Sequence, residues 1–393
     1  MTEFNFDAAV ERRGTGCCKW DAAQAGVIPL WVADMDFRTA PAVIEALHER
    51  VDHGVYGYEL VPDAWYEALS DWFERRHGWK IPKEEVLYTT GVVPACSAVI
   101  KAFTQPGDGV ALLTPAYNCF FSSIRNNGCF AAEVPLVLED EWRIDFEKLA
   151  QTLADPKVKV LLFCSPHNPV GRVWTADEIR RTAEIAQNAG VLFVSDEIHG
   201  EFVLGEKPYI PSVKVEGVNP LRTVTFTSPT KTFNLAGAGV AAIIAADPKV
   251  RAKIDRAIND NECCDVNVFG VTADIAAWTK GEPWLEALLE YLKGNLAELE
   301  KFFAEELPAA RVSKLEGTYL VWADMRPILG QNVDIKAFCE SVRAEEKVWV
   351  CEGTKYGRDG EGWIRINIAC PKAQLMEGLA RLAAGVKRST AAK

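Results

Sequence analysis

The sequence has no excess of positive charge and no long hydrophobic run. Its 393 residues carry a formal net charge of −12, which argues against nucleic-acid binding as the function of the chain. The longest stretch of small apolar residues, 235–246, contains two glycines and is too short to span a bilayer. Residues 1–7 are polar and mixed, so we expect no export signal and no membrane partner.

Histidine is scarce, and the cysteines form no metal-binding pattern. None of the five histidines pairs with another His or with Cys at ligand spacing, so we expect no metal site. Eleven cysteines without a secretory signal indicate reduced thiols and a cytoplasmic protein. Two adjacent pairs suit neither a relaxed disulfide nor a metal site, and we interpret them as free thiols. These pairs are Cys17-Cys18 and Cys263-Cys264.

The overall composition is that of an ordinary globular protein. Hydrophobic residues make up 49% of the chain and charged residues 25%. The length exceeds what one compact core usually holds, so we expect a large domain and a smaller one. From about Pro41, helix-like and strand-like stretches alternate. This alternation predicts an α/β fold with a mostly parallel sheet covered by helices.

Several elements of the large domain can be placed from their patterns. Apolar residues at helical spacing predict a helix over 63–76, and a capping box of Thr175 and Glu178 predicts the start of another. Four short apolar runs predict buried strands, and a fifth strand is expected after the last of these runs. The predicted strands cover 110–113, 158–164, 191–194, 223–227 and 239–246.

Past about residue 282 the pattern changes. A long helical pattern precedes two strand-like runs, at 318–322 and 362–367. We therefore predict three parts. They are an N-terminal segment, 1–40, that packs across the domain junction, a large domain, 41–282, and a smaller α+β domain, 283–393.

Three polar residues follow three of the predicted strands. Asn168, Asp196 and Lys231 stand at or just past carboxyl ends of strands, where open parallel sheets bind their ligands. A lysine there can form a Schiff base, and a carboxylate can pair with a pyridinium. Each residue also has a plain alternative, because lysines are mostly surface charges and Asn and Asp dominate turns and helix caps. Their occurrence together favours a pyridoxal phosphate site.

Along nearly its whole length, the chain resembles the fold-type I pyridoxal-phosphate enzymes of the aminotransferase class I/II group. Within that group it is most similar to the cystathionine β-lyase branch, the MalY/PatB type of cysteine-S-conjugate β-lyase. The matching motifs occur in the order found in the family. They are RRGT (12–15), KWD (19–21), WVADMDF (31–37), YGY (56–58), RHGW (76–79), TGVVPA (90–95), TPAY (114–117), CSPHNPVGRVW (164–174), SDEIH (195–199), SPTKTFN (228–234), PWL (283–285), TYLVW (318–322), YG (356–357) and IRIN (364–367).

The resemblance implies a role for each of five residues around the cofactor ring and the substrate. Lys231 would bind the cofactor aldehyde covalently and act as the catalytic base, and Asp196 would pair with the pyridine nitrogen. Asn168 would face the ring hydroxyl and the substrate carboxylate, while Tyr117 would stack on the ring. Arg365 would bind the substrate carboxylate, for which a planar guanidinium is well suited.

The resemblance also implies a phosphate site and a second subunit. Backbone N–H groups of Val92 and Val93, after Gly91, would bind the phosphate at a helix start. Ser228 would add its hydroxyl, and Tyr58 would reach the phosphate from the other subunit of a homodimer.

Two positions depart from the wider aminotransferase pattern, and both fit the β-lyase branch. His199 replaces a common tyrosine and is expected to contact the cofactor, and Gly239 stands where many relatives carry a phosphate-binding arginine. Residues 31–37 are expected to border the substrate pocket.

The implied reaction is β-elimination from a sulfur amino acid such as cystathionine or a cysteine conjugate, giving a thiol, pyruvate and ammonia. An aminotransferase is the main alternative, because it would use the same residues. A non-catalytic regulatory protein on the same fold is a further alternative. It is disfavoured because the four site residues Lys231, Asp196, Asn168 and Arg365 are all present.

Overall fold

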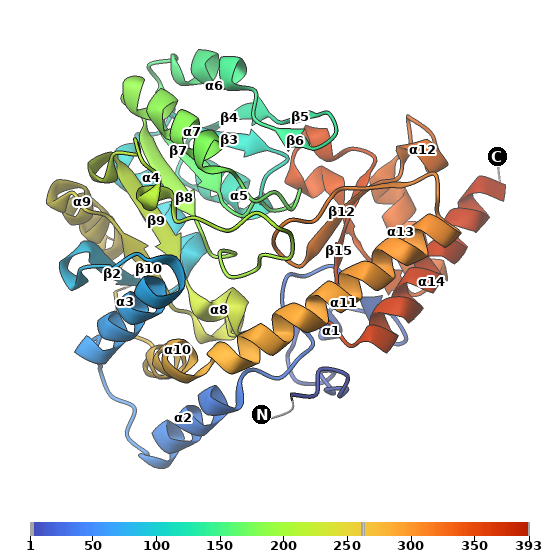
Figure 1. Ribbon diagram of the computed structural model, residues 1–393, viewed down its shortest axis with the longest axis horizontal. Helices are drawn as coiled ribbons and strands as arrows, with labels where there is room; N and C mark the ends of the chain where they lie inside the picture. The colour runs from blue at the N-terminus through green and yellow to red at the C-terminus, as the bar shows by residue number, and fades with distance from the viewer. Residues whose placement is uncertain (1–3, 261, 263, 392–393) are drawn as a thin grey trace.

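A seven-stranded sheet lies at the centre of the protein, whose computed structural model describes residues 4–260, 262 and 264–391 (Figure 1). In pairing order the strands are β2 (Val86–Thr89), β10 (Ala241–Ile244), β9 (Thr223–Thr227), β8 (Leu192–Asp196), β7 (Val158–Cys164), β3 (Gly109–Thr114) and β4 (Phe130–Pro135). Strand β10 pairs antiparallel with both of its neighbours, and the other neighbouring pairs are parallel. The sheet is therefore mostly parallel, as predicted.

Side chains alternate between the two faces of this sheet, as the pleat of a strand requires. In β3, Val110 and Leu112 belong to one buried cluster, and Ala111 and Leu113 belong to another. Helices cover both faces, so both faces are apolar. The first cluster includes α4 (Val92–Phe103), α5 (Asn118–Asn126) and α9 (Pro248–Asn259), and the second includes α6 (Phe146–Leu153) and α7 (Ala176–Asn188).

Three more helices pack together beside the β2 end of the sheet. They are α2 (Pro41–Asp52), α3 (Asp63–His77) and α10 (Val268–Lys280). Helix α10 leads into the long helix α11 (Glu282–Glu306), which runs from this group to the C-terminal part of the chain (Figure 1).

The C-terminal part is built on a smaller antiparallel sheet. Its strands, in pairing order, are β11 (Arg311–Val312), β12 (Leu320–Asp324), β15 (Trp363–Asn367) and β14 (Cys351–Glu352). Its helices are α12 (Arg326–Leu329), α13 (Ile335–Glu345) and α14 (Lys372–Ala391). The smaller α+β domain predicted after the long helix is confirmed.

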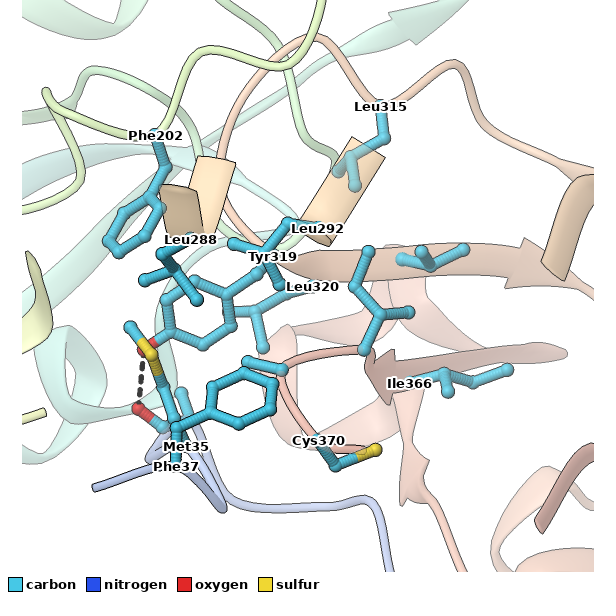
Figure 2. Packing of buried hydrophobic residues seen from close by; sticks show 14 of the residues in the cluster. Met35, Phe37, Phe202, Leu288, Leu292, Leu315, Tyr319, Leu320, Ile366 and Cys370 are labelled. Carbon is cyan, nitrogen blue, oxygen red and sulfur yellow. Dashed lines mark hydrogen bonds between the residues drawn. The ribbon is translucent and has the colours of Figure 1, made fainter. Parts of the chain in front are cut away.

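The N-terminal segment contacts both parts of the protein. It contains a short helix, α1 (Cys18–Asp21), and a two-residue strand, β1 (Ile28–Pro29), which pairs with β13 (Val348–Trp349). Met35 and Phe37 lie in one buried cluster with residues of α11 and of the small sheet (Figure 2). One continuous apolar core therefore joins all three parts of the chain.

Most of the local predictions agree with the structure. The strands predicted at 158–164 and 223–227 are β7 and β9, and the helix predicted over 63–76 is α3. The capping box is present, since Thr175 Oγ1 accepts from Glu178 N and the Glu178 carboxylate accepts from Thr175 N.

The described residues include ten free cysteines, while Cys263 lies outside the described part of the chain. Within the same residues, no helix is long and apolar enough to cross a membrane. No group of three or more His, Cys, Asp or Glu side chains there is arranged to hold a metal ion.

Candidate active site

A cavity of about 280 Å³ lies where β7, β8 and β9 end. Eight of the ten residues predicted to bind the cofactor line it. They are Gly91, Val92, Val93, Tyr117, Asn168, Asp196, His199 and Lys231. The topology explains this convergence, because the carboxyl ends of neighbouring parallel strands meet at one edge of the sheet.

Lys231 lies in the one-turn helix α8 (Pro229–Thr232), four residues after β9. Ser228 caps this turn, since its Oγ accepts a hydrogen bond from the backbone N–H of Thr230. The ammonium Nζ of Lys231 donates to the carbonyl oxygen of Ala33 at 2.6 Å. Removal from water lowers the pKa of Lys231 to about 8. A substantial fraction of this amine is therefore neutral near physiological pH.

Asp196 is the last residue of β8 and is buried. Its Oδ1 accepts a hydrogen bond from the backbone N–H of Ile198 at 3.2 Å. Burial raises the pKa of Asp196 to about 7. A cationic group bound in the cavity would favour the ionised carboxylate and lower this pKa again.

Arg365 lies in the middle of β15, and its hydrogen bond to Asn168 connects the small domain to a residue that lines the cavity. Its Nη1 donates to Asn168 Oδ1 at 3.1 Å, and its Nη2 donates to the carbonyl oxygen of Trp31 at 2.9 Å. The guanidinium carbon lies 4.8 Å from the centre of the Tyr356 ring. Arg365 Nε is buried and has no hydrogen-bond partner among the described residues. The side chain is thus fixed in position with donor capacity left for a ligand.

The first turn of α4 forms another wall of the cavity. Gly91 is the N-cap with φ of 151°, and Val92 and Val93 are the first two helical residues. The N–H groups of a first helical turn lack intrahelical acceptors, and the helix dipole favours an anion there. This wall can therefore bind a phosphate group.

Tyr117 and His199 complete the lining that was predicted. Tyr117 is the N-cap of α5 and is half-buried, and burial raises the pKa of its hydroxyl well above the ordinary value. Burial lowers the pKa of His199 to about 3, so its imidazole is neutral at physiological pH. His199 Nδ1 has no hydrogen-bond partner in the described part of the chain.

Three predicted residues lie away from the cavity surface or touch it indirectly. Arg365 reaches the site through Asn168. Ser228 Oγ donates to the carbonyl oxygen of Val240, and Tyr58 is 98% exposed on the surface of the subunit. The expected roles of Ser228 and Tyr58 toward a phosphate therefore remain predictions.

Ala33 and Thr230 also line the cavity and were not singled out from the sequence. Thr230 could have been considered as the neighbour of Lys231. Ala33 contributes a backbone carbonyl, which every residue type carries, so only the expectation that 31–37 border the pocket pointed toward it.

The mixed sheet, the smaller C-terminal domain and the cavity at the carboxyl ends of β7, β8 and β9 define the fold-type I class of α/β proteins. The chain belongs to the aminotransferase class I and II family, whose sequence model matches residues 25–382.

Two relatives resemble the chain along almost its full length. Cystathionine beta-lyase PatB of Bacillus subtilis is 38% identical over 97% of this chain and 100% of PatB. The protein MalY of Escherichia coli is 36% identical over 96% of this chain and 98% of MalY. Cystalysin of Treponema denticola, whose crystal structure contains a pyridoxal 5'-phosphate cofactor, superposes with a TM-score of 0.94. Its identity is 33%, over 98% of this chain and 99% of cystalysin.

Proposed function

We propose that the protein is a pyridoxal 5'-phosphate-dependent carbon–sulfur β-lyase. It cleaves cystathionine or a cysteine conjugate, with one water, to a thiol, pyruvate and ammonia. The observation that carries this proposal is the position of a half-buried amine, Lys231, and a buried carboxylate, Asp196, around one cavity with an anion-binding helix start. The 38% identity to a protein named cystathionine beta-lyase supports the choice of reaction.

The donor set of the cavity fits the cofactor. Lys231 Nζ would bind its aldehyde, and Asp196, which lacks a cationic partner at hydrogen-bond distance among the described residues, would hold the protonated ring nitrogen. Asn168 and His199 would contact the polar edge of the ring, and Tyr117 would stack on its face.

The phosphate of the cofactor would bind at the start of α4. The N–H groups of Val92 and Val93 after Gly91 supply donors there, and Gly239 leaves room beside them. Ser228 and the partner subunit are the further sources of hydroxyl groups in this proposal.

When bound, the cofactor withdraws electrons from Cα of the amino acid, a task for which protein side chains have no suitable group. The protein supplies orientation and proton transfer. Arg365 binds the α-carboxylate with the donors that its hydrogen bond to Asn168 leaves free. The neutral amine of Lys231 takes the proton from Cα, and the resulting ammonium gives a proton to the departing sulfur.

We also propose that the protein is a cytoplasmic homodimer in which Tyr58 enters the partner's site. Tyr58 is 98% and Leu60 is 88% exposed, so this segment presents two large apolar side chains to solvent in a single subunit. The ten described thiols are free, as reduced cysteines are in a cytoplasm.

The test is to incubate the purified protein with cystathionine, with and without a keto acid, and to measure thiol and pyruvate. We expect both products in equal amounts without a keto acid. Turnover that requires a keto acid and releases no thiol would instead identify an aminotransferase.

A pair of variants tests the lysine. Lys231→Ala is expected to abolish thiol release and the borohydride-reducible attachment of the cofactor. Lys249→Ala, which removes an exposed lysine in α9, is the matched control and is expected to retain both. A covalent adduct that persists in Lys231→Ala would show that another lysine binds the cofactor.

A further inference from the structure

Residues 31–37 form a segment, here named the strap, whose backbone is held on several sides. Asn367 Nδ2 donates to the carbonyl oxygens of Val32 and Asp34, at 2.6 and 2.7 Å. Asn234 Nδ2 donates to the carbonyl oxygens of Met35 and Phe37. The strap therefore has a fixed position against both the small sheet and the turn after Lys231.

The carbonyl oxygen of Ala33 lies at the centre of the strap and faces the cavity. It accepts hydrogen bonds from Lys231 Nζ at 2.6 Å and from the Tyr319 hydroxyl at 2.9 Å. Tyr319 is fully buried, and Figure 2 shows its ring close to the strap side chains Met35 and Phe37. This carbonyl accepts a hydrogen bond from the protonated amine of Lys231.

Two carboxylates of the strap are joined by one arginine of the N-terminal segment. Arg12 Nη2 contacts Asp34 Oδ2 at 2.6 Å, and Arg12 Nη1 contacts Asp36 Oδ1 at 2.6 Å. Asp36 is also paired with Lys19, which is 1% exposed, at 2.9 Å. The second oxygen of Asp34, Oδ1, is buried and has no hydrogen-bond partner in the described residues. Asp36 is thus neutralised by two cations, while Asp34 keeps an uncommitted oxygen.

We infer that Asp34 and the carbonyl of Ala33 together hold the protonated amine of Lys231 during turnover, and that Arg12 is the positioning residue that fixes Asp34. This inference rests on the proposed function. The proton that Lys231 takes from Cα stays on Nζ, where one N–H donates to the Ala33 carbonyl and the negative charge of Asp34, the next residue of the strap, stabilises the ammonium. The same proton then passes to the departing sulfur, and Nζ is neutral again.

The charges around Lys231 support this assignment. Among neighbouring groups, Asp34 has the largest influence that raises the pKa of Lys231, ahead of Asp196. Arg365 in β15 lowers the pKa of Lys231, and Cys119 in α5 raises it less than Asp34 does. His199 also faces the amine, but burial keeps it neutral.

The experiment measures uptake of pyridoxal 5'-phosphate by the full-length protein freed of cofactor, followed by absorbance as a function of pH. Only the neutral amine of Lys231 reacts, so the midpoint of the pH profile reports its protonation. In Asp34→Asn the loss of a negative charge is expected to lower the midpoint by about one pH unit, with about tenfold faster uptake below it. The kcat for thiol release is expected to fall about tenfold, with KM little changed, because the ammonium is held less well.

Arg12→Gln is expected to shift the midpoint of the pH profile in the opposite direction. It removes the positive charge that pairs with Asp34, so the uncompensated negative charge of Asp34 is expected to raise the midpoint. A general loss of structure would move both variants in the same direction. Asp324→Asn removes the carboxylate of a comparable ion pair with Arg326 in the small domain and is the matched control, with an unchanged midpoint. If Asp34→Asn does not fold, the sign of the Arg12→Gln shift decides alone.

The outcomes separate this inference from the proposed function. A wild-type protein that takes up no cofactor would overturn both. Wild-type uptake with thiol release, but with midpoints that do not move in opposite directions in the two variants, would overturn only the role of Asp34.

Discussion

Lys231 and Asp196 both border the cavity, and burial changes their pKa values in opposite directions. It lowers the pKa of Lys231 to about 8 and raises that of Asp196 to about 7, because removal from water disfavours the charged form of each group. The amine is thereby made available as a nucleophile and base. The carboxylate has no cationic partner at hydrogen-bond distance among the described residues, and a protonated ring nitrogen would supply one.

Asp196→Asn tests this electrostatic role. The neutral amide cannot stabilise a cationic ring nitrogen, so kcat for thiol release is expected to fall roughly 10²- to 10³-fold. The covalent attachment at Lys231 is expected to persist, which separates a loss of chemistry from a loss of binding. The measurement is steady-state kinetics together with the absorbance of the bound cofactor. A wild-type kcat in this variant would show that the charge of Asp196 is not needed for the reaction.

Arg365→Lys tests recognition of the α-carboxylate. Lysine cannot reproduce the planar pair of donors, so KM for cystathionine is expected to rise about 10- to 100-fold. Arg326→Lys, in an arginine–carboxylate pair of the same small domain, is the control and is expected to keep the wild-type KM. Equal effects in both variants would indicate that the small domain as a whole was disturbed.

At this scale, the sequence identifies side chains better than backbone contacts. Asn168, Asp196 and Lys231 could be predicted together because each follows a strand whose apolar run is easy to read. The carbonyl of Ala33 could not, because its importance arises from a contact 198 residues away along the chain.

Individual strands were predictable where apolar residues form a short run, and helices where apolar residues recur at helical spacing. Strands β7 and β9 were predicted with the bounds observed, since every second residue packs on each face of a buried sheet. The antiparallel direction of β10 could not be derived in this way. An apolar run identifies a strand but carries no information on its direction, which depends on the chain connections around it.

Helix α10 contains a buried carboxyl group that makes stability depend on pH. Asp274 is fully buried and accepts one hydrogen bond, from Trp65 Nε1 at 3.2 Å, and burial raises its pKa well above the ordinary value. The folded state therefore holds a proton that the unfolded state has lost above its own, lower pKa. The stability contributed by this group is complete below the unfolded pKa and is lost as pH rises through the folded pKa.

Asp274→Asn is expected to raise the free energy of unfolding by about 1 to 3 kcal/mol at pH 8 and to change it little at pH 4. The amide oxygen still accepts from Trp65 but requires no proton. Chemical denaturation at the two pH values is the measurement. An equal effect at both pH values would indicate a change in packing instead of proton uptake.

At the scale of the whole molecule, the division into 1–40, 41–282 and 283–393 stays a prediction. The two sheets and the helix α11 between them support it. The single core that runs from Phe6 through α11 to α14 argues that the parts fold and move together. The N-terminal segment reaches the site, because its Ala33 carbonyl accepts from Lys231 Nζ and its Arg12 pairs with the neighbouring Asp34.

The dimer is also a prediction at this scale, and it allows a decisive mixing experiment. If Tyr58 serves the partner's site, Tyr58→Ala and Lys231→Ala are each expected to have low activity as pure proteins. In a hybrid of the two chains, one site has a mutated lysine and a mutated tyrosine. The other site receives its native Lys231 from one chain and its native Tyr58 from the other.

The hybrid should therefore recover roughly half of the wild-type activity, as expected for a two-fold symmetric dimer. Two differently tagged Lys231→Ala chains form the control and should recover none. If Tyr58 instead acts on the site of its own subunit, no site in the hybrid is complete and no activity returns.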